Sequence, residues 1–170
     1  LPGIQMHLHK NIPMGAGLGG GSSDAASTLI GLNTLWDLHL DIATLCQLGL
    51  KLGADVPFFI FGQNAFVEGI GEKLQAISLE TQDFLVIFPN KGVATAQIFQ
   101  DPQLTRDHAP ITIDGFLASP RSYQSNDCQA VAVQKYPEVK QALDWIYKAV
   151  PNSAPCMSGS GSSVLRDFYL

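Results

Sequence analysis

Two groups of residues in this sequence have types and spacing suited to chemistry on a polyphosphate. The first is the glycine stretch, Gly15–Gly21, which runs directly into Ser22 and Ser23. Glycine lets a backbone approach a phosphate closely, and the free N–H groups at a helix start attract an anion. The second is the carboxylate of Asp55, which stands in a turn just before Pro57. It suits either a helix N-cap or a base that deprotonates a hydroxyl.

Three other interpretations of the glycine stretch fit less well. Gly15, Gly17 and Gly20 match the G-x-G-x-x-G pattern of dinucleotide sites, but Asp37 closes a helix rather than a second strand. No Lys-Ser or Lys-Thr pair follows the glycines, so the P-loop pattern is absent. A bare linker is not expected between a strand and an amphipathic helix. Phosphate binding at a helix start therefore remains, with a purely structural turn as the alternative.

The surrounding pattern predicts one mixed α+β unit that crosses into a second domain near Thr95. Ile4, Met6 and Leu8 alternate with polar residues and predict a strand over 4–11, and Ser22 or Ser23 is expected to cap the next helix. The other predicted elements are a helix to 37, a helix capped by Asp41, a short helix after Asp55, strands at 65–67, 73–77 and 84–88, helices from 95, at 127–135 and at 137–150, a polar connection at 101–124, and a glycine/serine loop after Cys156.

Composition excludes several classes of function. The chain has 170 residues, 46% of them hydrophobic, a net charge of -5 and no run of Lys or Arg, which speaks against nucleic-acid or membrane-surface binding. Its three cysteines form no CxxC pair, and this favours a reducing cytoplasm. His7 and His9 share a strand face but lack a third ligand, so we expect solvent-exposed histidines and no metal site. Trp36 and Trp145 are expected in the core.

The segment PMGAGLGGGSSDAA resembles the second motif of the GHMP kinases, the superfamily of galactose, homoserine, mevalonate and phosphomevalonate kinases. The segments LGADVPFF, AFVEGIGE, PNKGVATAQIF, SNDC and MSGSGSS resemble, in this order, one member that phosphorylates a cytidine diphosphate-linked sugar alcohol in isoprenoid precursor synthesis without mevalonate. The resemblance implies an α+β GHMP kinase fold. Its N-terminal domain is like ribosomal protein S5 domain 2, and its C-terminal domain is a ferredoxin-like α/β plait.

The resemblance also implies roles for individual residues, with ATP and Mg²⁺ as cofactors. Asp55 matches the catalytic base, against the N-cap alternative, and Lys10 matches a lysine beside the nucleotide. Asp24 is a candidate magnesium ligand, although an acid in a first helical turn is favoured in any case. Ser158–Ser163 match the third motif, which closes near the phosphates. The expected nucleotide-binding set is Lys10, Pro13, Met14, Gly15, Ala16, Gly17, Leu18, Gly19, Gly20, Gly21, Ser22 and Ser23. The expected substrate-binding set is Ile70, Thr95 and Phe99, for each of which plain core packing is the alternative.

The chain departs from this family at both ends. The family's first motif, with its lysine and its cytidine-gripping Tyr-His pair, is not found, nor is the region after the third motif. We therefore expect a central piece of a kinase, with residues 1–94 from the N-terminal domain and 95–170 from the C-terminal domain, inactive or poorly folded alone. A monomer or homodimer in a bacterial cytoplasm or plastid stroma is expected. The alternatives are a homoserine or mevalonate kinase, or a nucleotide-binding protein of this fold that no longer transfers phosphate.

Overall fold

The computed structural model describes residues 2–120, 125–150 and 154–168, which form two compact units. Unit 1 holds the residues up to Asn11 together with Gly19–Glu80, and unit 2 holds Ile12–Leu18 with the residues from Thr81 onward. Each unit has its own buried hydrophobic cluster. Over the described ranges, no helix combines the length and the apolar character needed to cross a membrane.

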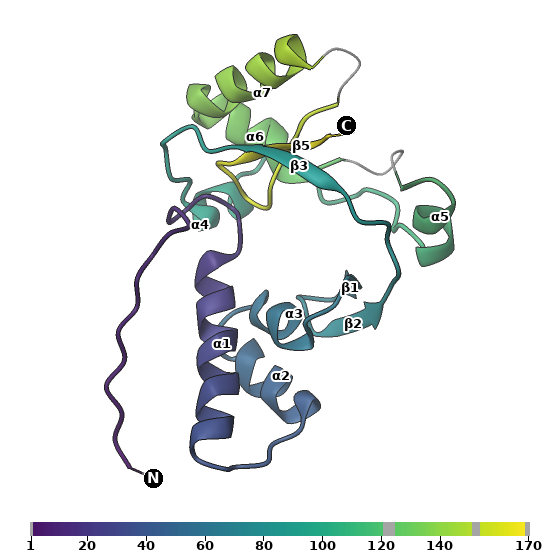
Figure 1. Cartoon of the computed structure of the whole chain (residues 1–170). Helices are drawn as coiled ribbons and strands as arrows, with labels where there is room; N and C mark the ends of the chain where they lie inside the picture. Colours follow the sequence, from purple (N-terminus) through teal and green to yellow (C-terminus); the bar gives the residue numbers. More distant parts are fainter. Residues whose placement is uncertain (1, 121–124, 151–153, 169–170) are drawn as a thin grey trace. The chain divides into compact units, whose positions relative to one another are not determined.

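Unit 1 combines helices with an antiparallel hairpin (Figure 1). Its elements are α1 (Gly20–Leu35), α2 (Ile42–Leu50), α3 (Val56–Phe61), β1 (Ala65–Glu68) and β2 (Lys73–Ala76). Ala26, Leu45, Val56 and Ile60 form its buried cluster. Gly49 lets α2 and α3 approach closely, because an added Cβ there would lie 2.7 Å from the Ile60 side chain. The three helices predicted in this part of the sequence are confirmed, as are both strands.

The helix starts in unit 1 are set by different residues. Asp41 caps α2 as predicted, because its carboxylate accepts a hydrogen bond of 2.8 Å from the Thr44 N–H. The prediction that Ser22 or Ser23 caps α1 is wrong, since both lie inside its first turn. The N-cap is Gly19, whose φ of 66° is left-handed and carries no Cβ penalty. The helix therefore begins within the glycine stretch itself.

The strand predicted over residues 4–11 is not formed. These residues have no regular secondary structure, and Ile4, Met6 and Leu8 are 41%, 60% and 57% exposed. A strand needs a neighbour with which to exchange backbone hydrogen bonds, and no described segment supplies one here. The segment runs beside α1 instead, where Lys10 forms an ion pair with Asp24.

Unit 2 pairs a three-stranded antiparallel sheet with helices. Its elements are β3 (Asp83–Ile87), α4 (Thr95–Phe99), α5 (Ile113–Ala118), α6 (Asp127–Lys135), α7 (Pro137–Ala149), β4 (Cys156–Met157) and β5 (Val164–Phe168). The strand order is β3-β5-β4. In Figure 1, α6 and α7 lie on one side of this sheet. Val131, Val139 and Ile146 from these helices pack with Met157 and Val164 from the sheet.

Two expectations for unit 2 are corrected. The connection predicted over 101–124 contains α5, whose N-cap Thr112 accepts a hydrogen bond from the Gly115 N–H. Residues 121–124 of that connection lie outside the described residues. Trp145 is not in the core, because it is 55% exposed on α7, whereas Trp36 in unit 1 is half-buried. The assignment of residues 1–94 and 95–170 to two family domains stays a prediction.

Candidate functional site

The glycine stretch enters unit 2 as a loop whose shape depends on its missing side chains. Gly15 and Gly17 have φ values of 66° and 71°, in the left-handed region. A Cβ on Gly17 would overlap the carbonyl oxygen of Ser158 and would lie 2.8 Å from that of Gly161. Only glycine fits at this position, because both the backbone conformation and the free space exclude a side chain.

The serine loop, Ser158–Ser163, holds the glycine stretch through backbone carbonyls. The Ser158 hydroxyl donates to the Gly17 carbonyl at 2.7 Å, and the Ser163 N–H donates to the Ala16 carbonyl at 2.9 Å. The Val93 N–H donates to the Gly15 carbonyl at 3.1 Å. These bonds occupy carbonyl oxygens and leave the N–H groups free. Within the described part of the chain, none of the N–H groups from Gly15 to Leu18 has a hydrogen-bond partner.

In unit 1, the glycine stretch continues as the start of α1. Gly19 lies against the ring of Phe59, where an added Cβ would be 2.8 Å from Cε2. The N–H groups from Gly19 to Ser22 also have no partner among the described residues. A helix start with free N–H groups carries a partial positive charge and favours an anion. Asp24, the fifth residue of α1, is already paired with Lys10, and both side chains are about one-third exposed.

Asp55 presents an exposed carboxylate in the turn before α3. It occupies the N-cap position but has helical backbone angles, and its side chain makes no capping hydrogen bond. The structural alternative for Asp55, an ordinary N-cap, therefore does not hold. Among the described residues, no ion pair or hydrogen bond engages this carboxylate, which leaves it available to a ligand.

The turn of the β1–β2 hairpin packs against the backbone next to Asp55. Gly71 has a φ of 123°, and a Cβ there would overlap the Ala54 carbonyl oxygen. The turn is closed by Glu72, whose carboxylate accepts a 2.7 Å hydrogen bond from the Ile70 N–H. Hydrogen bonds from the backbone N–H groups of Glu72 itself and of Ile70 hold the pKa of the Glu72 carboxyl below its usual value. Ile70 is 71% exposed, so core packing does not explain it.

The two other expected substrate residues lie on α4 in unit 2. The Thr95 hydroxyl is 2.8 Å from the Ser160 hydroxyl, which connects α4 to the serine loop. Phe99 is 56% exposed and lines a cavity of about 600 Å³ together with Arg106 and Met157, so it is not a core residue. Arg106 fixes this end of α4, because its guanidinium donates to the Phe99 carbonyl at 2.6 Å.

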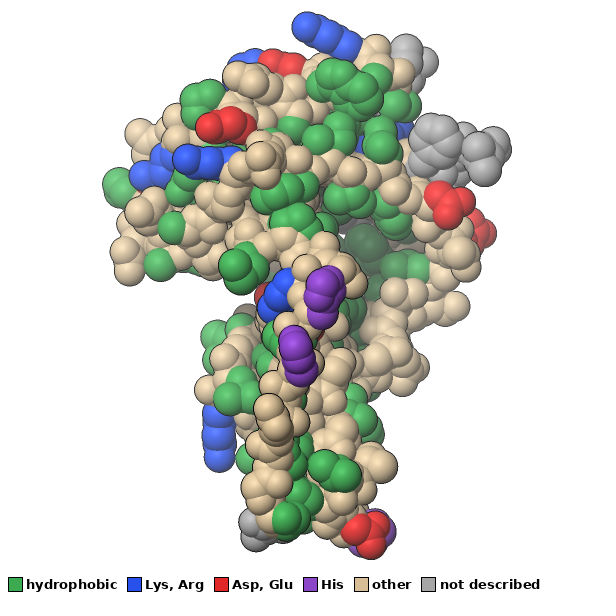
Figure 2. Space-filling model, turned by 60° about the vertical axis from the view of Figure 1, so that its left-hand side comes forward, with side chains coloured by type: hydrophobic (Ala, Val, Ile, Leu, Met, Phe, Trp, Pro, Cys, Tyr) green, Lys and Arg blue, Asp and Glu red, His purple; other side chains and the backbone are tan. Residues whose placement is uncertain are grey.

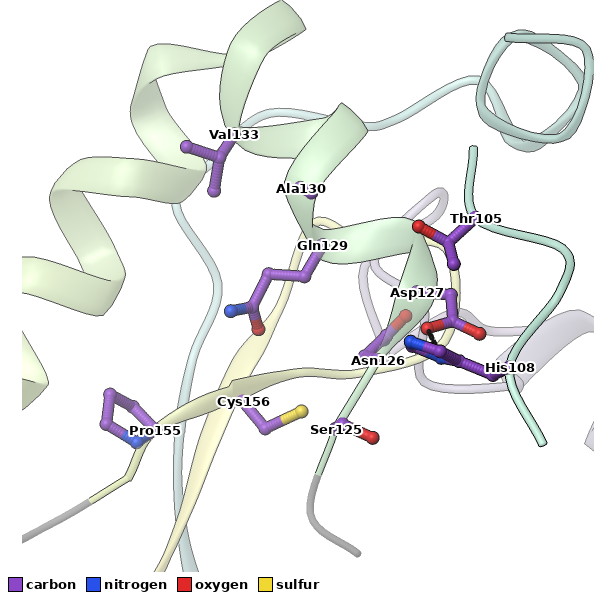
Figure 3. A pocket seen from close by; sticks show the side chains of 10 residues that line it. All are labelled: Thr105, His108, Ser125, Asn126, Asp127, Gln129, Ala130, Val133, Pro155 and Cys156. Carbon is purple, nitrogen blue, oxygen red and sulfur yellow. Dashed lines mark ion pairs between the residues drawn. The ribbon is translucent and has the colours of Figure 1, made fainter. Parts of the chain in front are cut away.

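The start of α6 holds a residue for which the sequence predicted no role. Asn126 there donates two hydrogen bonds to the carbonyls of Met157 and Gly159, each 2.7 Å long. It also lines a neighbouring cavity of about 510 Å³, at whose edge His108 and Asp127 form an ion pair of 2.7 Å (Figure 3). The segment SNDC contributed to the family resemblance, but a single asparagine gives no local signal of a distant contact.

No metal-binding cluster is found where the structure describes the chain. His7 and His9 are exposed, and histidine side chains are visible at the surface in Figure 2. Over the described ranges, no three side chains of His, Cys, Asp or Glu come together as a metal site. Lys and Arg side chains are scattered over the face drawn in Figure 2, without a broad basic patch there.

Comparison with known proteins connects these features to one family. Residues 2–63 match the GHMP kinases N terminal domain. A protein of Polynucleobacter necessarius subsp. necessarius named 4-diphosphocytidyl-2-C-methyl-D-erythritol kinase is 77% identical over 95% of this chain and 55% of its own length. The protein of the same name from Burkholderia thailandensis is 53% identical over 98% of this chain and 58% of its own length.

A solved structure agrees with the sequence comparison. A crystal structure of 4-(cytidine 5'-diphospho)-2C-methyl-D-erythritol kinase superposes with a TM-score of 0.74, at 33% identity, over 93% of this chain and 59% of its own. The chain is thus similar to the GHMP kinases and has their α+β fold. It spans a little over half the length of the relatives that it matches.

Proposed function

We propose that the chain is part of an ATP-dependent kinase that phosphorylates the 2-hydroxyl of 4-(cytidine 5'-diphospho)-2-C-methyl-D-erythritol. The observation that carries this proposal is the glycine stretch, whose carbonyls are held by the serine loop while its N–H groups stay free. Such an arrangement suits the phosphates of ATP. The names of the relatives supply the acceptor.

Each part of the proposed site has a role in phosphoryl transfer. The stretch from Pro13 to Ser23 holds the ATP phosphates, with Lys10 nearby. Asp55 orients the acceptor hydroxyl and takes its proton, which its free and exposed carboxylate can do. Ile70, Thr95 and Phe99 bind the acceptor, and their exposure leaves them accessible to it.

Mg²⁺ is part of this proposal, and the residues present fit a nucleotide-bound ion. Magnesium is usually held by one or two carboxylates together with substrate phosphates, so a protein cluster of three ligands is not needed. Asp24, the fifth residue of α1, would have to exchange its Lys10 partner for the ion. The ion would balance the charge of the transferred phosphoryl group.

The proposal also covers the compartment and the assembly. Cys46, Cys128 and Cys156 are free, which suits a bacterial cytoplasm. For the assembly, we propose a monomer or a homodimer that acts on small molecules.

A chimera tests the function directly. The chain replaces the matching 162 residues of the Polynucleobacter relative, and the product is offered ATP with the cytidine diphosphate-linked methylerythritol, homoserine or mevalonate. Phosphorylation of only the first acceptor supports the proposal. Phosphorylation of another acceptor would indicate a different GHMP kinase, and ATP binding without any transfer would indicate a non-catalytic protein.

A further inference from the structure

The serine loop is held from two sides. On one side it bonds to the glycine stretch through Ser158 and Ser163. On the other side it meets Asn126, the N-cap residue of α6, which Figure 3 shows at the start of that helix. The contacts on the second side belong to no part of the site proposed so far.

Asn126 uses its whole side-chain amide in these contacts. Its Nδ2 donates to the carbonyls of Met157 and Gly159, which stand on either side of Ser158 in the chain. Its Oδ1 accepts from the Cys128 N–H at 2.9 Å and so caps α6. One side chain therefore connects a helix start to both backbone groups that flank Ser158.

The loop needs such a support because its backbone is unusual. Gly159 and Gly161 have φ values of 53° and 94°. Two N–H groups close the loop locally: that of Gly161 donates to the Ser158 carbonyl, and that of Ser158 donates to the Ser163 carbonyl. Two carbonyls that point at the same region repel each other unless a donor lies between them. The Asn126 amide is the side-chain donor that both carbonyls share.

We propose that Asn126 is a positioning residue for nucleotide binding, which holds the serine loop in the shape that receives the glycine stretch. It acts through Ser158 and does not contact the nucleotide. The inference deepens the proposed function, and its importance for ATP rests on that function. The simpler alternative is that Asn126 only caps α6.

Asn126→Asp separates the two roles. A carboxylate still accepts from the Cys128 N–H and is favoured at a helix start, so the cap survives. It cannot donate, and it places negative charge against two carbonyl oxygens. Asn126→Ser keeps a cap without adding charge and serves as a second variant. Thr112→Ala is the matched control, because it removes the cap of α5 in the same unit without touching the serine loop.

Hydrogen exchange of the chimera without nucleotide measures the loop itself. In Asn126→Asp and Asn126→Ser, the N–H groups of Gly161 and Ser163 should exchange about tenfold faster or more, since two hydrogen bonds are lost. In Thr112→Ala they should exchange as in the parent chain. Equal exchange in all variants, equal acceleration across the whole of unit 2, or no protection of these two groups in the parent chain would overturn the proposal.

Kinetics of the chimera give the functional readout. Asn126→Asp should raise the KM for ATP about tenfold to a hundredfold while kcat changes little, because the loop shape affects ATP binding and not the acceptor base. An unchanged KM with faster loop exchange would also overturn the proposal. A parent chimera that transfers no phosphate would contradict the proposed function instead, and hydrogen exchange would still decide whether Asn126 holds the loop.

Discussion

The Ser158 hydroxyl donates a hydrogen bond of 2.7 Å to the carbonyl oxygen of Gly17, across 141 positions of sequence. Beside it, the Ser163 N–H donates to the Ala16 carbonyl. Because carbonyls are bound, the glycine stretch turns its N–H groups away from the serine loop. The anion binding that we propose for the stretch would therefore depend on residues far from it in the sequence.

Gly17→Ala should weaken nucleotide binding strongly. The left-handed backbone costs a residue with a Cβ about 1–2 kcal/mol, and the methyl group would overlap the Ser158 carbonyl. We expect the Kd for ATP, measured by calorimetry, to rise at least about tenfold. Gly31→Ala on α1 is the control, because nothing lies within 4 Å of a Cβ there. Identical ATP binding by the parent and Gly17→Ala would contradict this account of the loop.

Asp55→Asn should remove activity without loss of stability. The carboxylate caps nothing and is exposed, so the free energy of unfolding should stay within about 0.5 kcal/mol of the parent value. Loss of a general base should lower kcat about 10²- to 10⁴-fold in the chimera.

The control for Asp55 is Asp41→Ala, at the other aspartate that precedes a helix. Asp41 accepts from the Thr44 N–H, so its removal should lower the free energy of unfolding and leave kcat unchanged. If Asp55→Asn destabilised the protein as much as Asp41→Ala does, Asp55 would be a structural residue after all.

The ion pair of Asp101 with Lys135 should make stability sensitive to acid. The hydrogen bond from Lys135, at 2.7 Å, and the one from the Gln103 N–H hold the pKa of the Asp101 carboxyl below its usual value of 3.8. Because the pKa of Asp101 is lower in the folded protein than in the unfolded chain, the ion pair stabilises the folded protein fully above the unfolded pKa. This stabilisation is lost as the pH falls through the folded pKa.

Unfolding by urea, followed from about pH 6 to pH 2, checks this dependence. Asp101→Asn should lose less stability over the acid range than the parent does. Asp144→Asn removes the exposed pair with Lys140 on α7 and should leave the acid dependence as it is, because exposed pairs contribute little. If the free energy of unfolding depended on pH in the same way in the parent and in Asp101→Asn, the ion pair would not contribute to acid sensitivity.

Gly71→Ala should disturb the turn that carries Asp55. Its φ of 123° and the overlap with the Ala54 carbonyl leave no room for a methyl group, so the hairpin or the turn must move. We expect lower thermal stability of the chimera and a lower kcat, because displacement of a catalytic group by about 1 Å can cost about a hundredfold in rate. Gly3→Ala is the control, with nothing near its Cβ. A Gly71→Ala chimera with unchanged kcat would show that the hairpin does not position Asp55.

Several helix starts and the family motif could be predicted from local sequence. Asp41 caps α2, because a helix cap needs only a short acceptor side chain and the backbone N–H groups that follow it. Pro57 likewise starts α3 by its fixed φ. The resemblance of the glycine stretch to one kinase motif agreed with the relatives found, whereas the helix-start anion site stays a prediction.

Other features were decided only by tertiary structure. Residues 4–11 have the alternation of a strand but form none, because a strand exists only with a partner. Trp145 is exposed because burial depends on what packs against a helix face. The bond from Ser158 to Gly17 and the two bonds from Asn126 join residues far apart in the chain. Local sequence fixes the conformations that a segment can adopt, and only folding brings together the donors and acceptors that select one of them.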